Sequence, residues 1–315
     1  MQSIKIRPVK GIAECHAVTD LQVAAWGFAP EDIIPAHSIA AIIKSGGIVL
    51  GAFIRSLNGD HMIGFALGWT GLRGGRPYHY SDMLAVLPEY QEQGIGRALK
   101  LAQREAAMAQ GLELMSWTFD PLVARNAWFN IVKLGCTVRE YVINLYGEMQ
   151  SATHAGLPTD RFSTEWWLRS ARVMARVSGP RPDFAPARHP SSLWGRKFAE
   201  PDPYDSAAML IDEPDQPSFQ LPPDHQLITV TEPYPASRRL VGLRLDVGTA
   251  LAWAEIPAYI ENLKEADLEV ALEWRWQTRH LFQEYFARGY IITGMTRLDE
   301  GAERRVFYQL EASKA

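Results

Sequence analysis

The chain has 315 residues, enough for two average domains, and its 47% of hydrophobic residues can bury sizeable cores. The formal net charge of −4 gives no reason to expect a nucleic acid or an anionic membrane as partner. Two cysteines, Cys15 and Cys136, argue against a disulfide framework. We expect a cytoplasmic protein, because the N-terminus lacks a signal-peptide core and no apolar run reaches the roughly 18 residues of a membrane span.

Hydrophobic spacing predicts that the first 150 residues form one α/β unit. The turn signal Asn58-Gly59-Asp60 separates two strand-like runs, and Gly111 and Gly135 suit helix ends. The expected elements are, in chain order, a strand at Ile4–Arg7, helices at Ile12–Ala25 and Ser38–Lys44, strands at Gly47–Ile54, Met62–Thr70 and Tyr78–Leu87, a helix at Gly94–Gln110, a strand at Leu114–Phe119, a helix at Val123–Leu134 and a strand at Cys136–Tyr146.

The segment Gln91-Glu92-Gln93-Gly94-Ile95-Gly96 lies between a predicted strand and a predicted helix. The first turn of a helix presents unpaired N–H groups, and the helix dipole favours negative charge there. Glycines at positions 94 and 96 let the backbone approach a phosphate closely, because no Cβ stands in the way. The segment therefore predicts a pyrophosphate-binding turn.

Two common phosphate motifs do not fit this turn. A Walker loop needs Gly-x-x-x-x-Gly-Lys-Ser/Thr, which does not occur, and a dinucleotide fingerprint needs a third glycine. The pattern Gln/Arg-x-x-Gly-x-Gly/Ala after a strand resembles the pyrophosphate motif of the GNAT superfamily of acyl-CoA N-acyltransferases. Leu84-Ala85-Val86 resembles the fourth strand of that family, and Pro88-Glu89-Tyr90 resembles the loop after it. The resemblance covers about residues 4–149.

The resemblance implies a mixed, largely antiparallel central sheet flanked by helices, and acetyl-CoA as acyl donor. It also implies that the backbone of the fourth strand holds the thioester and that the glycine turn holds the pyrophosphate. The residues expected to bind the cofactor are Leu84, Ala85, Val86, Gln91, Glu92, Gln93, Gly94, Ile95, Gly96, Arg97 and Asn126. We expect no metal, because the histidines and cysteines lack metal-ligand spacing.

Asp82 is the candidate general base. It lies two residues before Leu84, so strand alternation places both on one face, and a partly buried carboxylate there should have a raised pKa. The alternative is an Asp that pairs with a nearby Arg or accepts a hydrogen bond from Ser81. His79 is expected on the opposite strand face as an exposed residue.

The general acid is less clear from the sequence. The family often has a tyrosine four residues before the glycine that follows the next helix, and Ile131 occupies that position here. Tyr141 and Tyr146 are candidate substitutes on the next strand, although the pattern favours a packed aromatic role for each. Arg97, Lys100 and Arg104 are spaced to share one helix face, which either contacts the 3′-phosphate of coenzyme A or is simply solvated.

The remaining chain divides into a connector at 151–190 and a C-terminal α/β domain at 191–315. The connector is expected to contain a helix at Phe162–Val177 followed by a proline-rich stretch. Trp117-Thr118-Phe119-Asp120-Pro121 is echoed by Trp253-Ala254-Glu255-Ile256-Pro257, each before a helix and a strand. The C-terminal domain is therefore either a degenerate GNAT-like half without a phosphate loop or a coincidental α/β pattern.

The sequence thus predicts a cytoplasmic N-acetyltransferase that moves an acetyl group from acetyl-CoA to a primary amine by direct attack. The acceptor, a small-molecule or peptide amine, is not specified. An alternative is a catalytically inactive acyl-CoA-binding protein with a regulatory or scaffolding role. The helical runs Ile256–Leu263 and Val270–Phe286, with Trp274 and Trp276, require burial against the first domain or against a second subunit in a homodimer.

Overall fold

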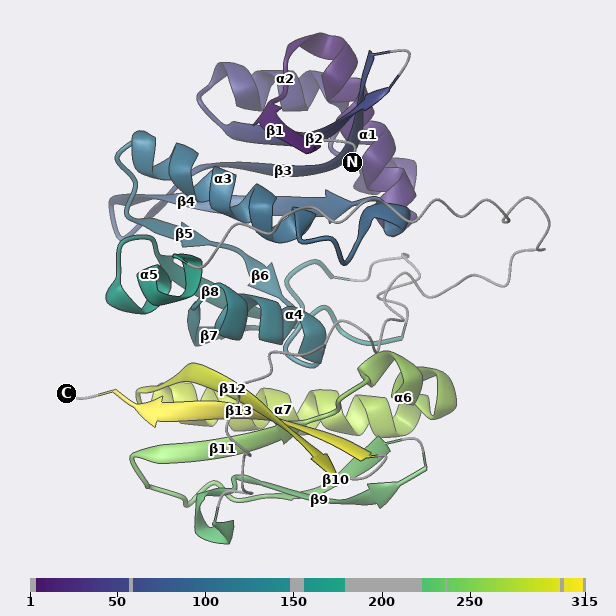
Figure 1. The fold of residues 1–315 in the computed structure, drawn as a ribbon. Helices are drawn as coiled ribbons and strands as arrows, with labels where there is room; N and C mark the ends of the chain where they lie inside the picture. The colour runs from purple at the N-terminus through teal and green to yellow at the C-terminus, as the bar shows by residue number, and fades with distance from the viewer. Residues whose placement is uncertain are drawn as a thin grey trace. The chain divides into compact units, whose positions relative to one another are not determined.

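The computed structural model describes residues 4–56, 59–147, 156–178, 223–235, 237–300 and 303–313. These residues form two compact units. The first contains the described residues up to 115 together with residue 178, and the second contains the other described residues from 116 onward. Figure 1 shows the helices and strands with their labels.

The first unit is a sheet with the strand order β1-β2-β3-β4-β5, in which neighbours from β1 to β4 are antiparallel. Its elements are β1 (Ile4–Pro8), α1 (Gly11–Trp26), η1 (Pro30–Asp32), α2 (Ala36–Lys44), β2 (Ile48–Ser56), β3 (Gly59–Arg73), β4 (Arg76–Val86), η2 (Pro88–Tyr90), α3 (Ile95–Ala109) and β5 (Leu114–Ser116). This order of strands and helices agrees with the order predicted from hydrophobic spacing.

Helices cover both faces of this sheet. The core cluster on one face joins α1 and α2 to the strands, and it includes Val18, Ile39, Phe65 and Ala85. Successive strand residues point to opposite faces. Leu84, the neighbour of Ala85, lies toward α3, because a Cβ added at the second residue of α3 would meet its Cδ2 atom at 3.5 Å. The start of α3 and the end of β4 are therefore in direct contact.

The second unit combines the strands after β5 with the described C-terminal part of the chain. Its elements are β6 (Thr118–Phe119), α4 (Ala124–Trp128), the π-helical turn η3 (Phe129–Lys133), β7 (Thr137–Val142), β8 (Arg161–Trp167), α5 (Ala171–Val177), η5 (Asp224–Gln226), β9 (Thr229–Tyr234), β10 (Ser237–Leu243), β11 (Leu251–Ile256), α6 (Ile260–Ala266), α7 (Leu268–Ala287), β12 (Tyr290–Glu300) and β13 (Glu303–Ala312).

The main sheet of this unit has the order β8-β7-β12-β13-β11, with β6 paired to β8, while β9 and β10 form a separate ribbon. Its two parts share one connectivity. In each part, the first strand is followed along the chain by helix and then by two further strands. The last of the three strands lies between the other two in the sheet, so that the spatial orders are β6-β8-β7 and β11-β13-β12. Of the two echoed tryptophans, Trp253 lies within β11, whereas Trp117 lies just before β6. Descent of the second part from a GNAT-like unit stays a prediction.

Three sequence expectations need correction in this unit. The predicted helix at Phe162–Val177 is wrong in its first half, because residues up to Trp167 form strand β8 and only α5 is helical. Phe162 and Trp166 are fully buried in that strand, and aromatic residues pack well on a pleated surface. The predicted strand at Leu114–Phe119 is interrupted at Trp117, whose N–H donates to Thr164 Oγ1 at 3.0 Å.

The predicted strand at Cys136–Tyr146 ends earlier, at Val142. Asn144 has a φ of 44°, a left-handed conformation that a strand cannot continue through. The proline-rich stretch predicted after the helix at Phe162–Val177 lies outside the described residues from residue 179 on. The functional division into 1–150, 151–190 and 191–315 stays a prediction. Among the described residues, no helix is long and apolar enough to cross a membrane.

Candidate functional site: the turn before α3 and the bulge in β4

The turn that leads into α3 has the backbone of an anion site. Gly94 caps the helix with φ 75° and ψ 4°, and Glu92 also has a positive φ, of 66°. The first N–H to find an acceptor in the helix is that of Ala98, which donates to Gly94 O at 3.0 Å. The N–H groups of Ile95 and Gly96 precede it and have no acceptor within the helix. Such a turn offers an anion several backbone donors at the positive end of a helix dipole.

The turn is held against the end of β4 by one of its own side chains. Gln91 Nε2 donates to Val86 O at 3.1 Å, so the predicted cofactor residue Gln91 closes the loop. Gln93 and Arg97 are half-buried, and the Glu92 side chain is exposed. The left-handed backbone conformation of Glu92 costs free energy, and the closed loop holds the residue in it.

The three predicted residues of the fourth strand lie at the end of β4. Ala85 and Val86 are buried, whereas Leu84 is half-buried and contacts the start of α3. The strand pairs with β3 in the register Ala66↔Leu84, Phe65↔Ala85 and Gly64↔Val86. Gly64 suits this tight pairing, because a Cβ there would meet Ala85 O at 2.8 Å. The structure therefore brings the strand end and the glycine turn together.

Asp82 lies on a β-bulge in β4. Between the pairs Leu67↔Met83 and Trp69↔Tyr80, two residues of β4 stand opposite one residue of β3. A bulge bends its strand and re-aims side chains, and bulges are frequent beside active sites. The extra residue also shifts the alternation of side chains along β4. Spacing in the sequence therefore cannot show whether a residue before the bulge and a residue after it lie on the same face of the sheet.

The Asp82 carboxylate has no hydrogen bond or ion pair with any residue that the structure describes. Burial raises its pKa to about 6, and burial is the only cause of the shift. The alternative interpretation, in which Ser81 donates to Asp82, is not realised, because Ser81 Oγ donates to Gln103 Oε1 at 2.7 Å. A carboxylate with this pKa can accept a proton near neutral pH.

His79 differs from the expectation of an exposed side chain. It is fully buried, and neither ring nitrogen has a hydrogen-bond partner within the described residues. Desolvation, followed by the charge of Lys100, lowers the pKa of His79 to about 3. An imidazole with so low a pKa is neutral and a weak base at pH 7, so His79 is a poor substitute for Asp82.

The basic residues of α3 do not form the solvated stripe considered from the sequence. Lys100 is only 3% exposed and its Nζ donates to Ser81 Oγ at 2.6 Å, and Arg104 is also buried. Arg97, one turn nearer the glycine loop, is half-buried. Of the three residues, Arg97 therefore remains the candidate for a phosphate contact.

The second unit holds the other three predicted site residues. Asn126 lies half-buried in α4, and the family's usual tyrosine position, Ile131, is fully buried in the π-helical turn. Tyr141 donates a hydrogen bond to Asp160 Oδ2 at 2.7 Å. Burial is the largest cause of a rise in the pKa of Tyr141 above its ordinary value, and this hydrogen bond adds to the rise. Tyr146 is 43% exposed. Tyr141 is half-buried, so Tyr146 is the more exposed of the two tyrosines.

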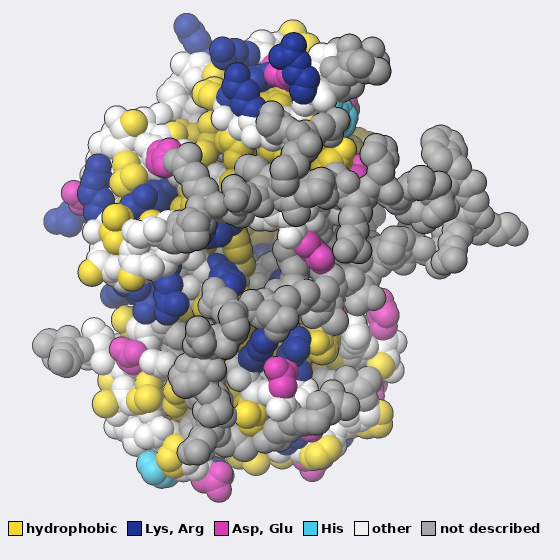
Figure 2. All heavy atoms as spheres, viewed as in Figure 1, with side chains coloured by type: hydrophobic (Ala, Val, Ile, Leu, Met, Phe, Trp, Pro, Cys, Tyr) yellow, Lys and Arg dark blue, Asp and Glu magenta, His cyan; other side chains and the backbone are white. Residues whose placement is uncertain are grey.

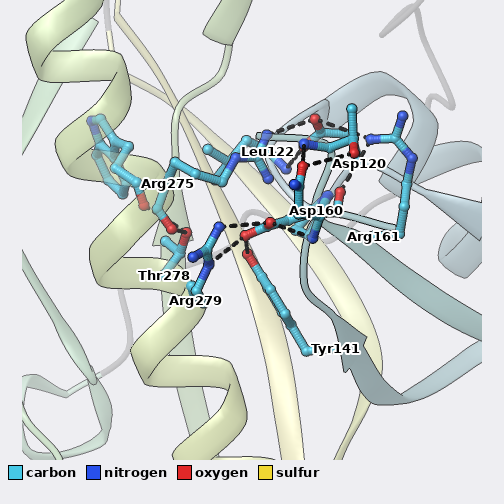
Figure 3. A network of polar contacts seen from close by, with 12 residues as sticks. Asp120, Leu122, Tyr141, Asp160, Arg161, Arg275, Thr278 and Arg279 are labelled. Atoms are coloured by element: carbon cyan, nitrogen blue, oxygen red, sulfur yellow. Dashed lines mark hydrogen bonds and ion pairs between the residues drawn. The ribbon is translucent and has the colours of Figure 1, made fainter. Parts of the chain in front are cut away.

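Sequence reasoning missed a group of buried charges in the second unit (Figure 3). The group comprises Asp120, Asp160, Arg161, Arg275 and Arg279. Arg275 and Asp120 are paired although 155 positions separate them along the chain. Neither spacing nor periodicity relates residues so far apart, and only the echo around Trp117 and Trp253 hinted that these segments share a unit.

Comparison with known proteins identifies the first part of the chain. Residues 17–129 match the model of the acetyltransferase (GNAT) family. This segment is a GNAT domain. It contains the C-terminal part of α1, the β4 bulge, the glycine turn and α3. The resemblance noted from the motif is therefore confirmed, as is the mixed, largely antiparallel sheet flanked by helices.

Solved structures of similar fold include the acetyltransferase of the GNAT family from Streptococcus pneumoniae, at 16% identity and a TM-score of 0.39 over 52% of this chain and 98% of that one. Another is the NatC complex bound to Gag peptide and CoA, at 15% identity and a TM-score of 0.42 over 52% of this chain and 98% of that one. Likenesses this weak say nothing about the acceptor of this chain. A search of curated proteins finds no match.

The charge pattern on the surface agrees with the modest net charge. On the face in Figure 2, the described Lys and Arg side chains lie in separate groups interspersed with acidic and apolar ones. Among the described residues, no group of three or more His, Cys, Asp or Glu side chains could hold a metal ion.

Proposed function

We propose that the protein is a cytoplasmic N-acetyltransferase that uses acetyl-CoA as the acyl donor. The observation that carries this proposal is the contact between two features of the GNAT domain. The turn at Gly94, the candidate anion site, adjoins the end of β4. The Asp82 carboxylate on β4 has no hydrogen bond or ion pair within the described residues, and burial raises its pKa to about 6. The turn would hold the pyrophosphate of coenzyme A through backbone N–H groups, with Arg97 beside it.

In the proposed reaction, the amine nitrogen attacks the thioester carbonyl, so that a C–N bond forms and the C–S bond breaks. Asp82 accepts the proton that the amine loses, directly or through water. Backbone N–H groups near Leu84, Ala85 and Val86 would stabilise the developing oxyanion. The leaving thiolate takes a proton, and the products are the N-acetylated acceptor and free coenzyme A.

The proposed function makes two measurable demands on the full-length protein. Acetyl-CoA at 100 times its dissociation constant should stabilise the folded state by about 2.7 kcal/mol. Free thiol should also appear when acetyl-CoA and a panel of amines are supplied together. Stabilisation without thiol release from any amine would favour the alternative, an inactive acyl-CoA-binding protein. Absence of stabilisation in millimolar acetyl-CoA would exclude both.

We propose Tyr146 as the proton donor to the thiolate. Tyr146→Phe should lower kcat roughly 10²-fold, the lower end of the range for general acid–base catalysis, and should leave the affinity for acetyl-CoA unchanged. Tyr141→Phe is the matched control. The Tyr141 hydroxyl donates a hydrogen bond to Asp160 and has a raised pKa. Removing this hydroxyl should therefore cost about 1–2 kcal/mol of folding stability with little change in kcat. The reverse pattern in steady-state kinetics would assign the proton to Tyr141.

A further inference from the structure

A small group of buried polar side chains joins β4 to α3 within the first unit. Ser81, Lys100 and Gln103 are all buried, and the last two lie three positions apart on α3, so they share one face of the helix. Ser81 Oγ accepts a hydrogen bond from Lys100 Nζ at 2.6 Å and donates one to Gln103 Oε1 at 2.7 Å. Because the hydroxyl gives its only proton to one partner and accepts from the other, its orientation is fixed. These three residues are called the Ser81 clamp.

The Ser81 clamp acts on the bulge that carries Asp82. Ser81 and Asp82 are the two residues of β4 that stand opposite Gly68 of β3. A Cβ added at Gly68 would collide with Tyr80 O and with the His79 ring, so β3 packs closely against this part of β4. The bulge is therefore held by β3 along one edge and by α3 through the Ser81 side chain.

Stability by itself does not explain the polar residues between β4 and α3. Gln103 Nε2 is buried with no hydrogen-bond partner within the described residues, and the same is true of both ring nitrogens of His79. The charge of Lys100 also helps to lower the pKa of His79. A buried polar group with unpaired atoms generally stabilises a fold less than apolar side chains of similar volume. The geometry that the Ser81 clamp imposes is the better explanation for its presence.

Helix α3 connects the Ser81 clamp to the candidate anion site. The helix begins at Ile95, directly after Gly94, and Lys100 follows five residues later, about 7.5 Å along the helix axis. Groups that are held by one helix keep their separation more precisely than groups on loops. Since Asp82 directly follows Ser81, the distance between its carboxylate and the turn at Gly94 depends on the clamp.

We propose that Lys100 and Gln103 are positioning residues, which hold Ser81 and thereby fix the Asp82 carboxylate relative to the turn at Gly94. The inference rests on the proposed N-acetyltransferase function, in which Asp82 accepts the proton of the amine. Lys100 and Gln103 act only through Ser81 and touch neither substrate. Because a reacting group that is misplaced by about 1 Å can cost about 10²-fold in rate, a clamp on the bulge matters for turnover.

Titration of the Asp82 carboxyl group tests the proposal without turnover. NMR of the full-length protein, isotope-labelled at its aspartate side chains, would follow the signal that Asp82→Asn removes. The wild-type midpoint is expected at about 6, because the carboxylate is buried. Ser81→Ala and Lys100→Met should lower the midpoint toward about 3.9, because a carboxylate released from its position gains solvent. Loss of the Lys100 charge by itself would act in the opposite direction. An unchanged midpoint in both folded variants would overturn the proposal.

Steady-state kinetics tests the consequence for turnover. Ser81→Ala and Lys100→Met should lower kcat about 10- to 100-fold and leave the KM for acetyl-CoA unchanged, whereas Ser81→Thr keeps the hydroxyl and should restore kcat. The control is Gln22→Met, which removes a buried side chain that exchanges hydrogen bonds of 2.9 and 3.1 Å with the backbone of Ile34. It should cost stability but keep both kcat and the Asp82 midpoint. Failure of the proposed function would show instead as a wild type that acetyl-CoA does not stabilise.

Discussion

Asp82→Asn is expected to lower kcat roughly 10²- to 10⁴-fold, the usual contribution of general base catalysis. The amide fills the same volume on the β4 bulge, but it cannot accept the proton that the attacking amine must lose. Affinity for acetyl-CoA should hardly change, because the proposed pyrophosphate contacts come from the turn at Gly94. Thiol-release kinetics combined with calorimetry separates the two effects.

The pH dependence of activity and of stability provides an independent test of the role of Asp82. Since burial raises the pKa of Asp82 to about 6, the base is protonated below that pH and kcat/KM should rise through it. The stability effect has the opposite direction. The folded state binds this proton more tightly than the unfolded state, whose Asp titrates near 3.9, so the contribution to stability is lost as pH rises from about 4 through 6. Asp82→Asn should remove both dependences.

Asp60→Asn is the control for Asp82→Asn. Asp60 is an acidic residue of the same unit whose side chain is 38% exposed beside Arg7, far along the chain from the glycine turn. The activity of Asp60→Asn should stay within about twofold of the wild type, because an exposed ion pair contributes little free energy. Full activity of Asp82→Asn would instead assign proton acceptance to solvent water.

Gly94→Asp should abolish measurable binding of acetyl-CoA. Gly94 has a φ of 75°, which an L side chain adopts only with strain, and the new carboxylate would stand where the anion is expected. At a fixed acetyl-CoA concentration, the ligand-induced rise in melting temperature seen for the wild type should disappear. The variant must be folded, which far-UV circular dichroism verifies.

Strain alone must be separated from the loss of an anion site. Gly74→Asp introduces the same residue at another positive φ, of 56°, in the turn between β3 and β4, where nothing lies within 4 Å of an added Cβ. It should cost stability in a similar way but keep the response to acetyl-CoA. Equal loss of the response in both variants would mean that the turn before α3 has no special role in binding.

Local sequence patterns determined the strand–turn–helix at the centre of the GNAT domain. The apolar run to Val86, the glycines at 94 and 96 and the helical spacing up to Gly111 are all contiguous, and their physical consequences are local. The pairing of β2 with β3 could be predicted for the same reason, since a short turn favours pairing of neighbouring strands. The candidate cofactor residues other than Asn126 lie within this contiguous stretch.

Only the tertiary structure decided the features that depend on pairing across the chain. The β4 bulge is visible only in the register with β3, and the burial of His79 and Lys100 depends on how β4 and α3 pack. The strand at Phe162 could not be distinguished from a helix by spacing, because it is buried on both faces and shows no clean alternation.

The second unit shows the same limit most clearly. Asp120 and Arg275 carry opposite charges 155 positions apart, and no local propensity links them. Their pairing depends on β12, β13 and α7 joining β7 and β8 in one unit, which is a consequence of long-range burial. Sequence spacing reports the faces of single helices and strands, whereas a buried ion cluster is assembled by the packing of many elements.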